Sequence, residues 1–433
     1  MNEIKFLLDH LDTGVLQNIG GRVGDFVRLI QTNDPVDEKA LMTRLFEGKW
    51  QRQNYLNLKA RTRRILRAFY LMNPVGNTSL QKRLRKCRSV YFLAVSFVDE
   101  GNRKEGEKLL KKALRIAEEN GLTKIAYDCV VELMSCAAIH RRPTELRQYS
   151  VRAQALLNDL EAENTAEQHY LEVIVGTNTN NSPSYEFINE RIQKLTKYQC
   201  STTRYIHYYY LLCIARDSEC CDYPRIKQSA KAALHMLRDK RGVYGSTLQF
   251  FSKHQAIAHI ALREYPAATQ LLTTAEQYAP PRSFNRGILY YYQAFGALHA
   301  RNYEDAHQLY REHRNTPYTV LAEQWTIMGA YLYFLKRSGH LGSGGERFSV
   351  GKYLNETAPT AHDKLGNNVN IIIGELLVCL VKNRDRYIDR VDSVRNYVYK
   401  YLQVPATRRA HHFLHLLCLL PRADFNYPKL RHL

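Results

Sequence analysis

The segment Tyr290–Tyr310, YYYQAFGALHARNYEDAHQLY, carries the pattern that decides the fold. Small and apolar residues lead into the polar pair Arg301-Asn302, and a second helical pattern with Ala306 near its start follows. A small residue on each side of the turn lets two helices approach closely, and an aromatic residue one turn later fills the groove between them. The segment therefore predicts a hairpin of two α-helices.

The same arrangement recurs along the chain, for example after Gly101 and after Arg263. Equivalent positions are 40 residues apart from 106 to 146, 42 from 226 to 268 and 38 from 268 to 306. The residues at these positions, each near the start of a second helix, are Gly106, Leu146, Ile226, Ala268 and Ala306. This recurrence predicts an irregular array of helical hairpins.

The hairpins resemble the tetratricopeptide repeat. Tyr303 and Ala306 stand in the consensus places of its turn, and Arg301 stands where glycine is usual. The resemblance covers residues 83–315, with repeats longer than the roughly 34 residues that are usual. It implies an all-α fold, a right-handed α-solenoid in which a groove binds a protein or peptide partner. A plain helical bundle is the alternative.

Proline and glycine in residues 73–77 predict the first boundary. Residues 1–78 are expected to form a basic N-terminal helical module, and residues 79–433 the solenoid. Further helix pairs are expected at residues 318–337 with 346–355 and at residues 365–382 with 386–402. The apolar helix expected at residues 408–420 would close the end of the array.

Composition excludes several classes of protein. Hydrophobic residues make up 45% of the 433 residues and charged residues 24%, which excludes global disorder. The apolar stretches are too short to predict a membrane span. The nine scattered cysteines and the lack of a secretory signal pattern lead us to expect reduced thiols and a cytoplasmic protein that does not bind membranes.

Most of the net charge of +20 lies in two segments, residues 49–88 and the tail at residues 408–433. Twelve Lys and Arg residues lie between positions 49 and 88, and residues 49–98 contain no Asp or Glu. Clustered cations suit an anionic partner, either nucleic acid, bound through its phosphates, or an acidic protein. The alternative is a solvated basic face, or one paired with acidic residues elsewhere in the fold. The candidate anion-binding residues are Lys59, Arg61, Arg63, Arg64, Arg67, Lys82, Arg83, Arg85 and Lys86.

Residues 36–72 also have the order of elements found in a DNA-reading helix-turn-helix. One helix is expected at residues 36–45, a turn at Glu47-Gly48, and a second helix at residues 54–72. Any helical hairpin shares this order, so the pattern favours DNA reading only weakly.

Thirty tyrosines offer a second kind of candidate site, because tyrosine presents apolar area together with a hydroxyl group. The candidate groove residues are Tyr208, Tyr209, Tyr291 and Tyr292. The competing interpretation is that these rings fill the space between helices, and it is the one that the sequence favours.

No motif predicts catalysis, a metal site or a cofactor. The glycine-rich residues 345–353 lack the spacing and the Ser or Thr of a phosphate loop. The three histidines in residues 411–415 have no acidic or Cys partner at metal-ligand spacing, and Cys220-Cys221 is no CxxC pair. The sequence therefore predicts a non-catalytic interaction protein, a scaffold, adaptor or regulator. The alternative is a nucleic-acid-binding regulator that uses residues 49–88.

Overall fold

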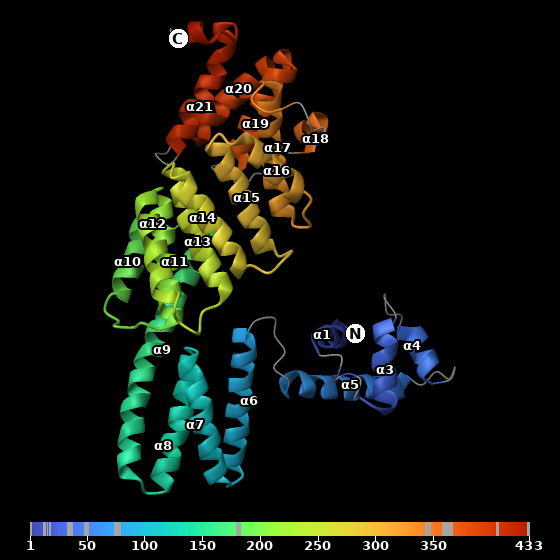
Figure 1. Cartoon of the computed structure of the whole chain (residues 1–433), viewed down its shortest axis with the longest axis vertical. Coiled ribbons are helices and arrows are strands. Elements are labelled where there is room, and N and C mark those ends of the chain that lie inside the picture. Colours follow the sequence, from blue (N-terminus) through green and yellow to red (C-terminus); the bar gives the residue numbers. More distant parts are fainter. Residues whose placement is uncertain are drawn as a thin grey trace. The chain divides into compact units, whose positions relative to one another are not determined.

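The computed structural model describes residues 2–11, 14, 16, 19–32, 38–46, 52–72, 79–178, 183–342, 348–356, 367–403 and 407–430 (Figure 1). Of these described residues 84% are helical and none lies in a strand, which confirms the all-α prediction. Within the same residues, no helix combines the length and apolar character needed to cross a membrane. The chain divides into two compact units. Unit 1 comprises residues 1–164, 202–204 and 240–243, and unit 2 comprises residues 165–201, 205–239 and 244–433.

The first part of unit 1 has a hydrophobic core of its own. Its helices are α1 (Asn2–His10), α3 (Gly21–Thr32), α4 (Glu38–Leu45) and α5 (Arg52–Met72). Helices α1 and α3 both contact α5, and Phe26 and Leu66 are fully buried in the cluster that they share. Residues 2–72 therefore contain a core of the kind expected for an N-terminal module, but the predicted boundary falls in residues 73–78, outside the described residues.

The remaining helices follow one another as packed pairs (Figure 1). In unit 1 they are α6 (Ser79–Asp99), α7 (Arg103–Glu119), α8 (Thr123–Ile139) and the start of α9 (Pro143–Asn178). Unit 2 continues with α10 (Tyr185–Leu195), α11 (Thr203–Glu219), α12 (Tyr223–Leu237), α13 (Gly245–Ala261), α14 (Tyr265–Ala275), η1 (Glu276–Tyr278), α15 (Phe284–His299) and α16 (Tyr303–His313).

The C-terminal helices of unit 2 lie close to where the sequence predicts them. They are α17 (Thr319–Arg337), α18 (Val350–Glu356), α19 (Asn367–Lys382), α20 (Arg384–Tyr401), α21 (Arg408–Leu419), η3 (Leu420–Ala423) and α22 (Tyr427–Leu430). Helix α21 packs on α20 and buries Leu414 and Leu417 in the cluster that α19 and α20 share.

Several of the turns between consecutive helices share one geometry. Between α15 and α16, the Asn302 amide donates to the Ala297 carbonyl oxygen at 2.9 Å, and the Arg301 amide donates to Leu298 at 3.2 Å. This pair of bonds closes a helix end when the residue between them is left-handed, and Arg301 has φ +62°. The other left-handed turn residues are Gly101, Gly121, Arg141, Cys221, Arg263 and Gly339.

The equivalent positions predicted from the sequence lie at a constant distance from these turns. Gly106, Ile226, Ala268 and Ala306 are all buried, and each stands five residues after a left-handed position. Seven residues before three of those positions stand Ala94, Ala256 and Ala294, whose side chains are fully buried. Small side chains therefore face each other across the hairpins, as the sequence pattern predicts. The observed pairs are consistent with a helical repeat array.

Candidate partner-binding site

Five of the nine candidate anion-binding residues are engaged by other residues of the chain. The Lys59 ammonium lies 2.8 Å from the Glu38 carboxylate and is itself mostly buried. Both Arg63 and Arg67 approach Glu3, at 3.8 Å and 2.6 Å. The pKa of Glu3 and that of Glu38 are therefore both lowered, chiefly by the hydrogen bonds from Arg67 and Lys59.

Arg83 and Arg85, on α6, make contacts of another kind. Arg83 Nε donates to the Asn120 side-chain oxygen at 2.6 Å, and Arg83 Nη2 donates to the Arg241 carbonyl oxygen at 3.4 Å. Arg85 donates to the Tyr70 hydroxyl group and lies 4.3 Å from the centre of that ring. These two guanidinium groups therefore bind groups of the chain itself.

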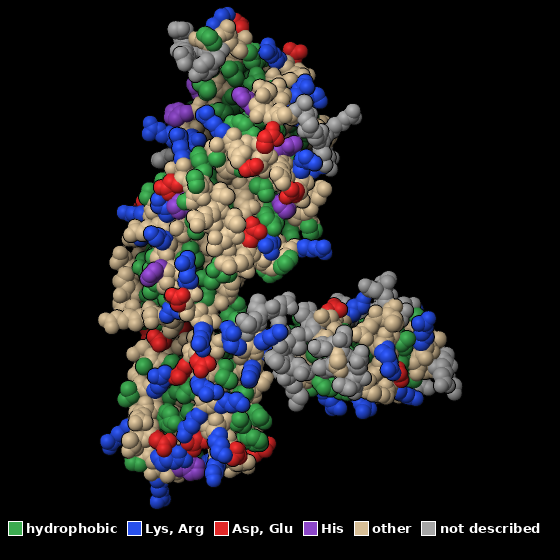
Figure 2. All heavy atoms as spheres, viewed as in Figure 1, with side chains coloured by type: hydrophobic (Ala, Val, Ile, Leu, Met, Phe, Trp, Pro, Cys, Tyr) green, Lys and Arg blue, Asp and Glu red, His purple; other side chains and the backbone are tan. Residues whose placement is uncertain are grey.

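The other four candidates are exposed, and within the described part of the chain they make no ion pair. They are Arg61, Arg64, Lys82 and Lys86. On α6 to α8, cationic and anionic side chains are intermixed over the face that Figure 2 shows. The structure thus divides the predicted basic segment into a paired part and a smaller solvated part.

The candidate tyrosines also separate into two groups. Tyr208 donates to the Glu167 carboxylate at 2.6 Å and lines a cavity. The Tyr209 ring stacks on Tyr205, with ring centres 5.9 Å apart. Tyr291 and Tyr292 pack against buried clusters between helices, and Tyr291 meets Trp325 edge-on at 5.5 Å. Of the four, only Tyr208 lines the cavity.

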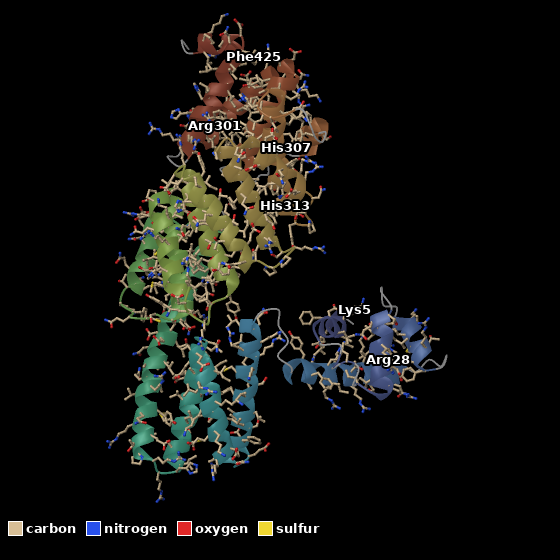
Figure 3. All side chains as sticks on the ribbon, viewed as in Figure 1. Lys5, Arg28, Arg301, His307, His313 and Phe425 are labelled. Atoms are coloured by element: carbon tan, nitrogen blue, oxygen red, sulfur yellow. The ribbon has the colours of Figure 1, made fainter. Side chains whose placement is uncertain are left out.

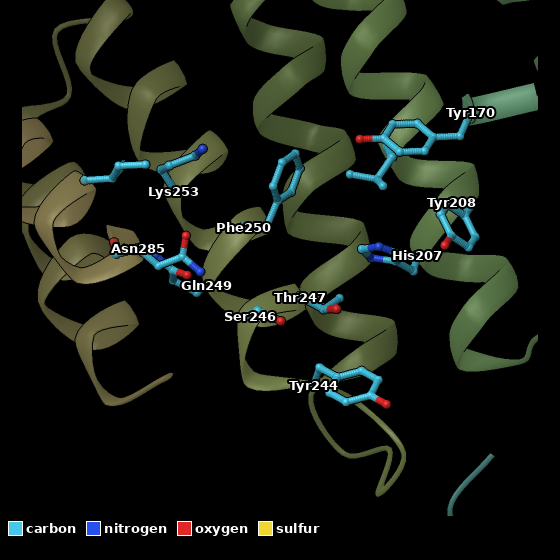
Figure 4. A pocket seen from close by; sticks show the side chains of 12 residues that line it. Tyr170, His207, Tyr208, Tyr244, Ser246, Thr247, Gln249, Phe250, Lys253 and Asn285 are labelled. Carbon is cyan, nitrogen blue, oxygen red and sulfur yellow. Dashed lines mark hydrogen bonds between the residues drawn. The ribbon is translucent and has the colours of Figure 1, made fainter. Parts of the chain in front are cut away.

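That cavity lies in unit 2 and has a volume of about 450 Å³. Helices α11, α13 and α15, the first helices of three consecutive hairpins, supply most of its wall, and α9 adds Tyr170 (Figure 4). Ring side chains form much of the lining. The lining residues are Tyr170, His207, Tyr208, Leu211, Tyr244, Ser246, Thr247, Gln249, Phe250, Lys253, Asn285 and Ile288. A concave, mainly apolar site with a few polar groups is typical of ligand binding in proteins.

Lys253 is the one Lys or Arg in that lining. Its ammonium group lies 5.1 Å from the centre of the Phe250 ring, and the two side chains stand side by side in Figure 4. No ion pair or hydrogen bond holds this ammonium group in the part of the chain that the structure describes. Burial therefore lowers the pKa of Lys253 without an acidic neighbour to oppose the shift.

Two half-buried histidines lie near this lysine: His207 lines the cavity, and His254 follows Lys253 in the chain. Burial lowers the pKa of His207 to about 4, against a weaker opposing effect of Glu167. Burial and the Lys253 charge lower the pKa of His254 to about 3, and its Nδ1 lies 2.8 Å from the Phe250 carbonyl oxygen. Both imidazoles are neutral at pH 7, so Lys253 carries the positive charge of this region.

The sequence analysis missed Lys253, although a signal for it exists. Residues 240–263 contain no Asp or Glu, so a lysine on α13 has no acidic partner along its own helix. Outside residues 244–253, the wall comes from segments between 32 and 83 positions away from Lys253, so that no local spacing predicts the cavity.

Among the described residues there is no cluster of three or more His, Cys, Asp or Glu able to hold a metal ion. The Cys220 and Cys221 thiols are free and exposed. The glycine-rich segment falls partly in residues 343–347, outside the described residues. The turn of the expected helix-turn-helix is also outside them, although α4 and α5 lie where its helices are expected.

No protein-family model matches this chain, and no curated protein is similar enough to it to count as a match.

Proposed function

We propose that this protein is a non-catalytic interaction protein that binds a segment of a protein or peptide partner along the first helices of the hairpins in unit 2. The observation that supports this most is the cavity on α11, α13 and α15, which has aromatic walls and an unpaired lysine. Rings give large contact areas at low entropic cost, and they are enriched where proteins recognise partners.

The repeat geometry supports the same proposal. The left-handed turns and the facing small residues agree with a tetratricopeptide-like array, in which the first helices of the pairs would line one groove. In such an array, consecutive first helices present a continuous surface to an extended segment. The cavity is then the part of this surface where aromatic side chains surround a lysine.

Peptide selection tests the proposal directly. We would select phage-displayed 12-residue peptides against the full chain and then measure the binding of enriched peptides to two variants. Ser246→Trp places an indole at the cavity mouth, where Ser246 is exposed. Thr273→Trp adds the same indole to an exposed position of α14, away from the cavity.

The expected result is that enriched peptides bind the native chain and Thr273→Trp equally but bind Ser246→Trp at least about tenfold more weakly, since a filled cavity excludes them. Enrichment of no peptide, or equal binding to all three proteins, would contradict the proposal.

The second candidate function is the binding of nucleic acid by exposed cations of α5 and α6. The observation that favours it is that Arg61 and Arg64, three residues apart on α5, have no acidic partner in the described chain. Phosphate contacts of this kind give an affinity that falls steeply with salt.

The corresponding experiment is a salt series with an unrelated double-stranded DNA. Changing both Arg61 and Arg64 to Gln should flatten the salt slope by about 2, whereas changing both Lys104 and Lys112 to Gln removes the same charge from α7 and should not flatten it. Equal slopes for the two double variants would argue against a specific role for α5.

A further inference from the structure

The Lys253 cavity has a charge that no residue in the described part of the chain balances. A desolvated ammonium group is stabilised when an anion shares its site. The imidazoles of His207 and His254 lie near the cavity and are neutral, so they add no positive charge. No described carboxylate pairs with Lys253. An anion from outside the described chain would balance this charge.

The lining also restricts the kind of molecule to which the anionic group can belong. One lysine balances one negative charge, which suits a carboxylate better than a doubly charged phosphate. Rings of Tyr170, Tyr208, Tyr244 and Phe250 supply the remaining wall, and they favour an apolar or aromatic body. The volume of about 450 Å³ is within the range of small-molecule sites.

A direction of binding follows from the charges at the two sides. Tyr208 donates to Glu167 at 2.6 Å, so a carboxylate lies behind the Tyr208 side of the cavity, within hydrogen-bond distance of the Tyr208 hydroxyl group. In Figure 4, Lys253 and Phe250 stand apart from Tyr170, His207 and Tyr208. A ligand carboxylate is therefore repelled from the Tyr208 side and attracted to Lys253, while its apolar body faces the tyrosines.

We propose that this cavity binds a carboxylate joined to an apolar or aromatic body, with the Lys253 ammonium group as the counter-ion of the carboxylate. The inference rests on the proposed function in its choice of cavity. The carboxylate could belong to a free small molecule or to the end of a peptide chain, and these two sources share the chemistry proposed.

The test begins with the native full chain and two nearly isosteric probes, 3-phenylpropionate and its neutral amide, titrated by calorimetry at pH 7. The acid should bind at least about tenfold more tightly than the amide, because only the acid is paired with Lys253. Absence of binding by the acid, or equal binding of acid and amide, overturns the proposal without any variant.

Variants then assign the charge to Lys253. Lys253→Met keeps the length and the apolar stem of the side chain. Removing a half-buried charge that has no acidic partner among the described residues should raise the midpoint of thermal unfolding. It should lose the preference for the acid and keep the affinity for the amide. Lys231→Met removes an exposed lysine of α12 and should change neither affinity. A Lys253→Met variant that still prefers the acid contradicts the assignment.

A third set of titrations distinguishes a free small molecule from the end of a peptide chain as the source of the carboxylate. Acetyl-Gly-Gly-Phe with a free carboxylate and its C-terminal amide are compared in the same way. Tight binding of the free acid identifies a chain end, and failure of the peptide with binding of 3-phenylpropionate identifies a small molecule. Selected peptides that bind the native chain but not Ser246→Trp, together with equal binding of the acid and amide probes, would support the proposed function and overturn only this inference.

Discussion

Gly106 lies directly against Ala94 across the α6–α7 hairpin. A Cβ atom built on Gly106 would lie 3.0 Å from the Ala94 carbonyl oxygen and 2.7 Å from Cγ2 of Val98. The glycine thus sets the distance between the two helices, in the place that alanine occupies in the hairpins at Ala268 and Ala306.

We expect Gly106→Ala to destabilise the protein. The added methyl group gains about 1 kcal/mol of helix propensity but overpacks the contact with Ala94 at a cost of about 1–3 kcal/mol. A net loss of about 1 kcal/mol should appear in urea unfolding. Gly351→Ala, where a Cβ meets no atom within 4 Å, is the control and should cause no loss. An unchanged midpoint for Gly106→Ala would mean that α6 and α7 can move apart without a loss in the free energy of unfolding.

Arg301→Gly should have the opposite effect. Arg301 is exposed at the α15–α16 turn (Figure 3) and has φ +62°, a conformation that costs a residue with a Cβ about 1–2 kcal/mol. Glycine removes this strain but costs chain entropy, so the net gain should be about 0.5–1 kcal/mol in chemical denaturation. Arg311→Gly, in an exposed position of α16, should instead lose about 1 kcal/mol. A loss at both positions would rule out strain at the turn.

Glu107 should make the stability of unit 1 sensitive to acid. Arg142 donates to both oxygens of this buried carboxylate, at 2.9 Å each, and Lys111 adds a third contact at 2.8 Å. These hydrogen bonds lower the pKa of Glu107 to about 2 from 4.5. Because the folded pKa is depressed, the stabilisation is complete above pH 4.5 and is lost as the pH falls toward 2.

Glu107→Gln tests this dependence. The variant should lose about 2 kcal/mol at pH 7 and show a smaller further loss between pH 4.5 and 2 than the native chain. Glu105→Gln changes an exposed carboxylate of the same helix and should leave the profile close to native. Parallel profiles for native and Glu107→Gln would show that the ion pair does not carry the acid sensitivity.

His207 should make the stability of the fold depend on pH in a higher range than Glu107 does. Its folded pKa of about 4 lies below the ordinary value of 6.5, so the neutral ring stabilises the fold fully above pH 6.5, and this contribution is lost as the pH falls toward 4. His207→Phe keeps a ring and removes the proton site. We expect a flatter stability profile between pH 6.5 and 4, measured by thermal unfolding, whereas His235→Gln on the exposed face of α12 should keep the native profile.

The hairpins could be predicted because their determinants are local. A left-handed residue and a small residue five positions later are close in sequence, and the helical period fixes which faces meet. Arg301 illustrates the limit of consensus matching, since it stands where glycine is usual and still adopts the conformation that glycine favours.

The candidate sites were less predictable because their partners are distant along the chain. Nothing near Arg67 in sequence indicates Glu3, and the charge of residues 49–88 therefore looked less paired than it is. The environment of Lys253 likewise depends on α9, α11 and α15. The sequence could have indicated only that residues 240–263 lack an acidic partner for it.

Because the turns within hairpins have a constant length, variation in the length of the chain occurs in the connections between hairpins. Three residues separate the two helices in the hairpins α6–α7, α13–α14 and α15–α16, at 100–102, 262–264 and 300–302, whereas the connections that follow α12 and α16 differ in length, at 238–244 and 314–318. Differences in spacing along the chain are thus absorbed between hairpins. An inserted loop or an epitope tag should be tolerated at Asn315, in the exposed connection between α16 and α17, whereas the same insertion after Arg301 would displace every side chain of α16 from its groove.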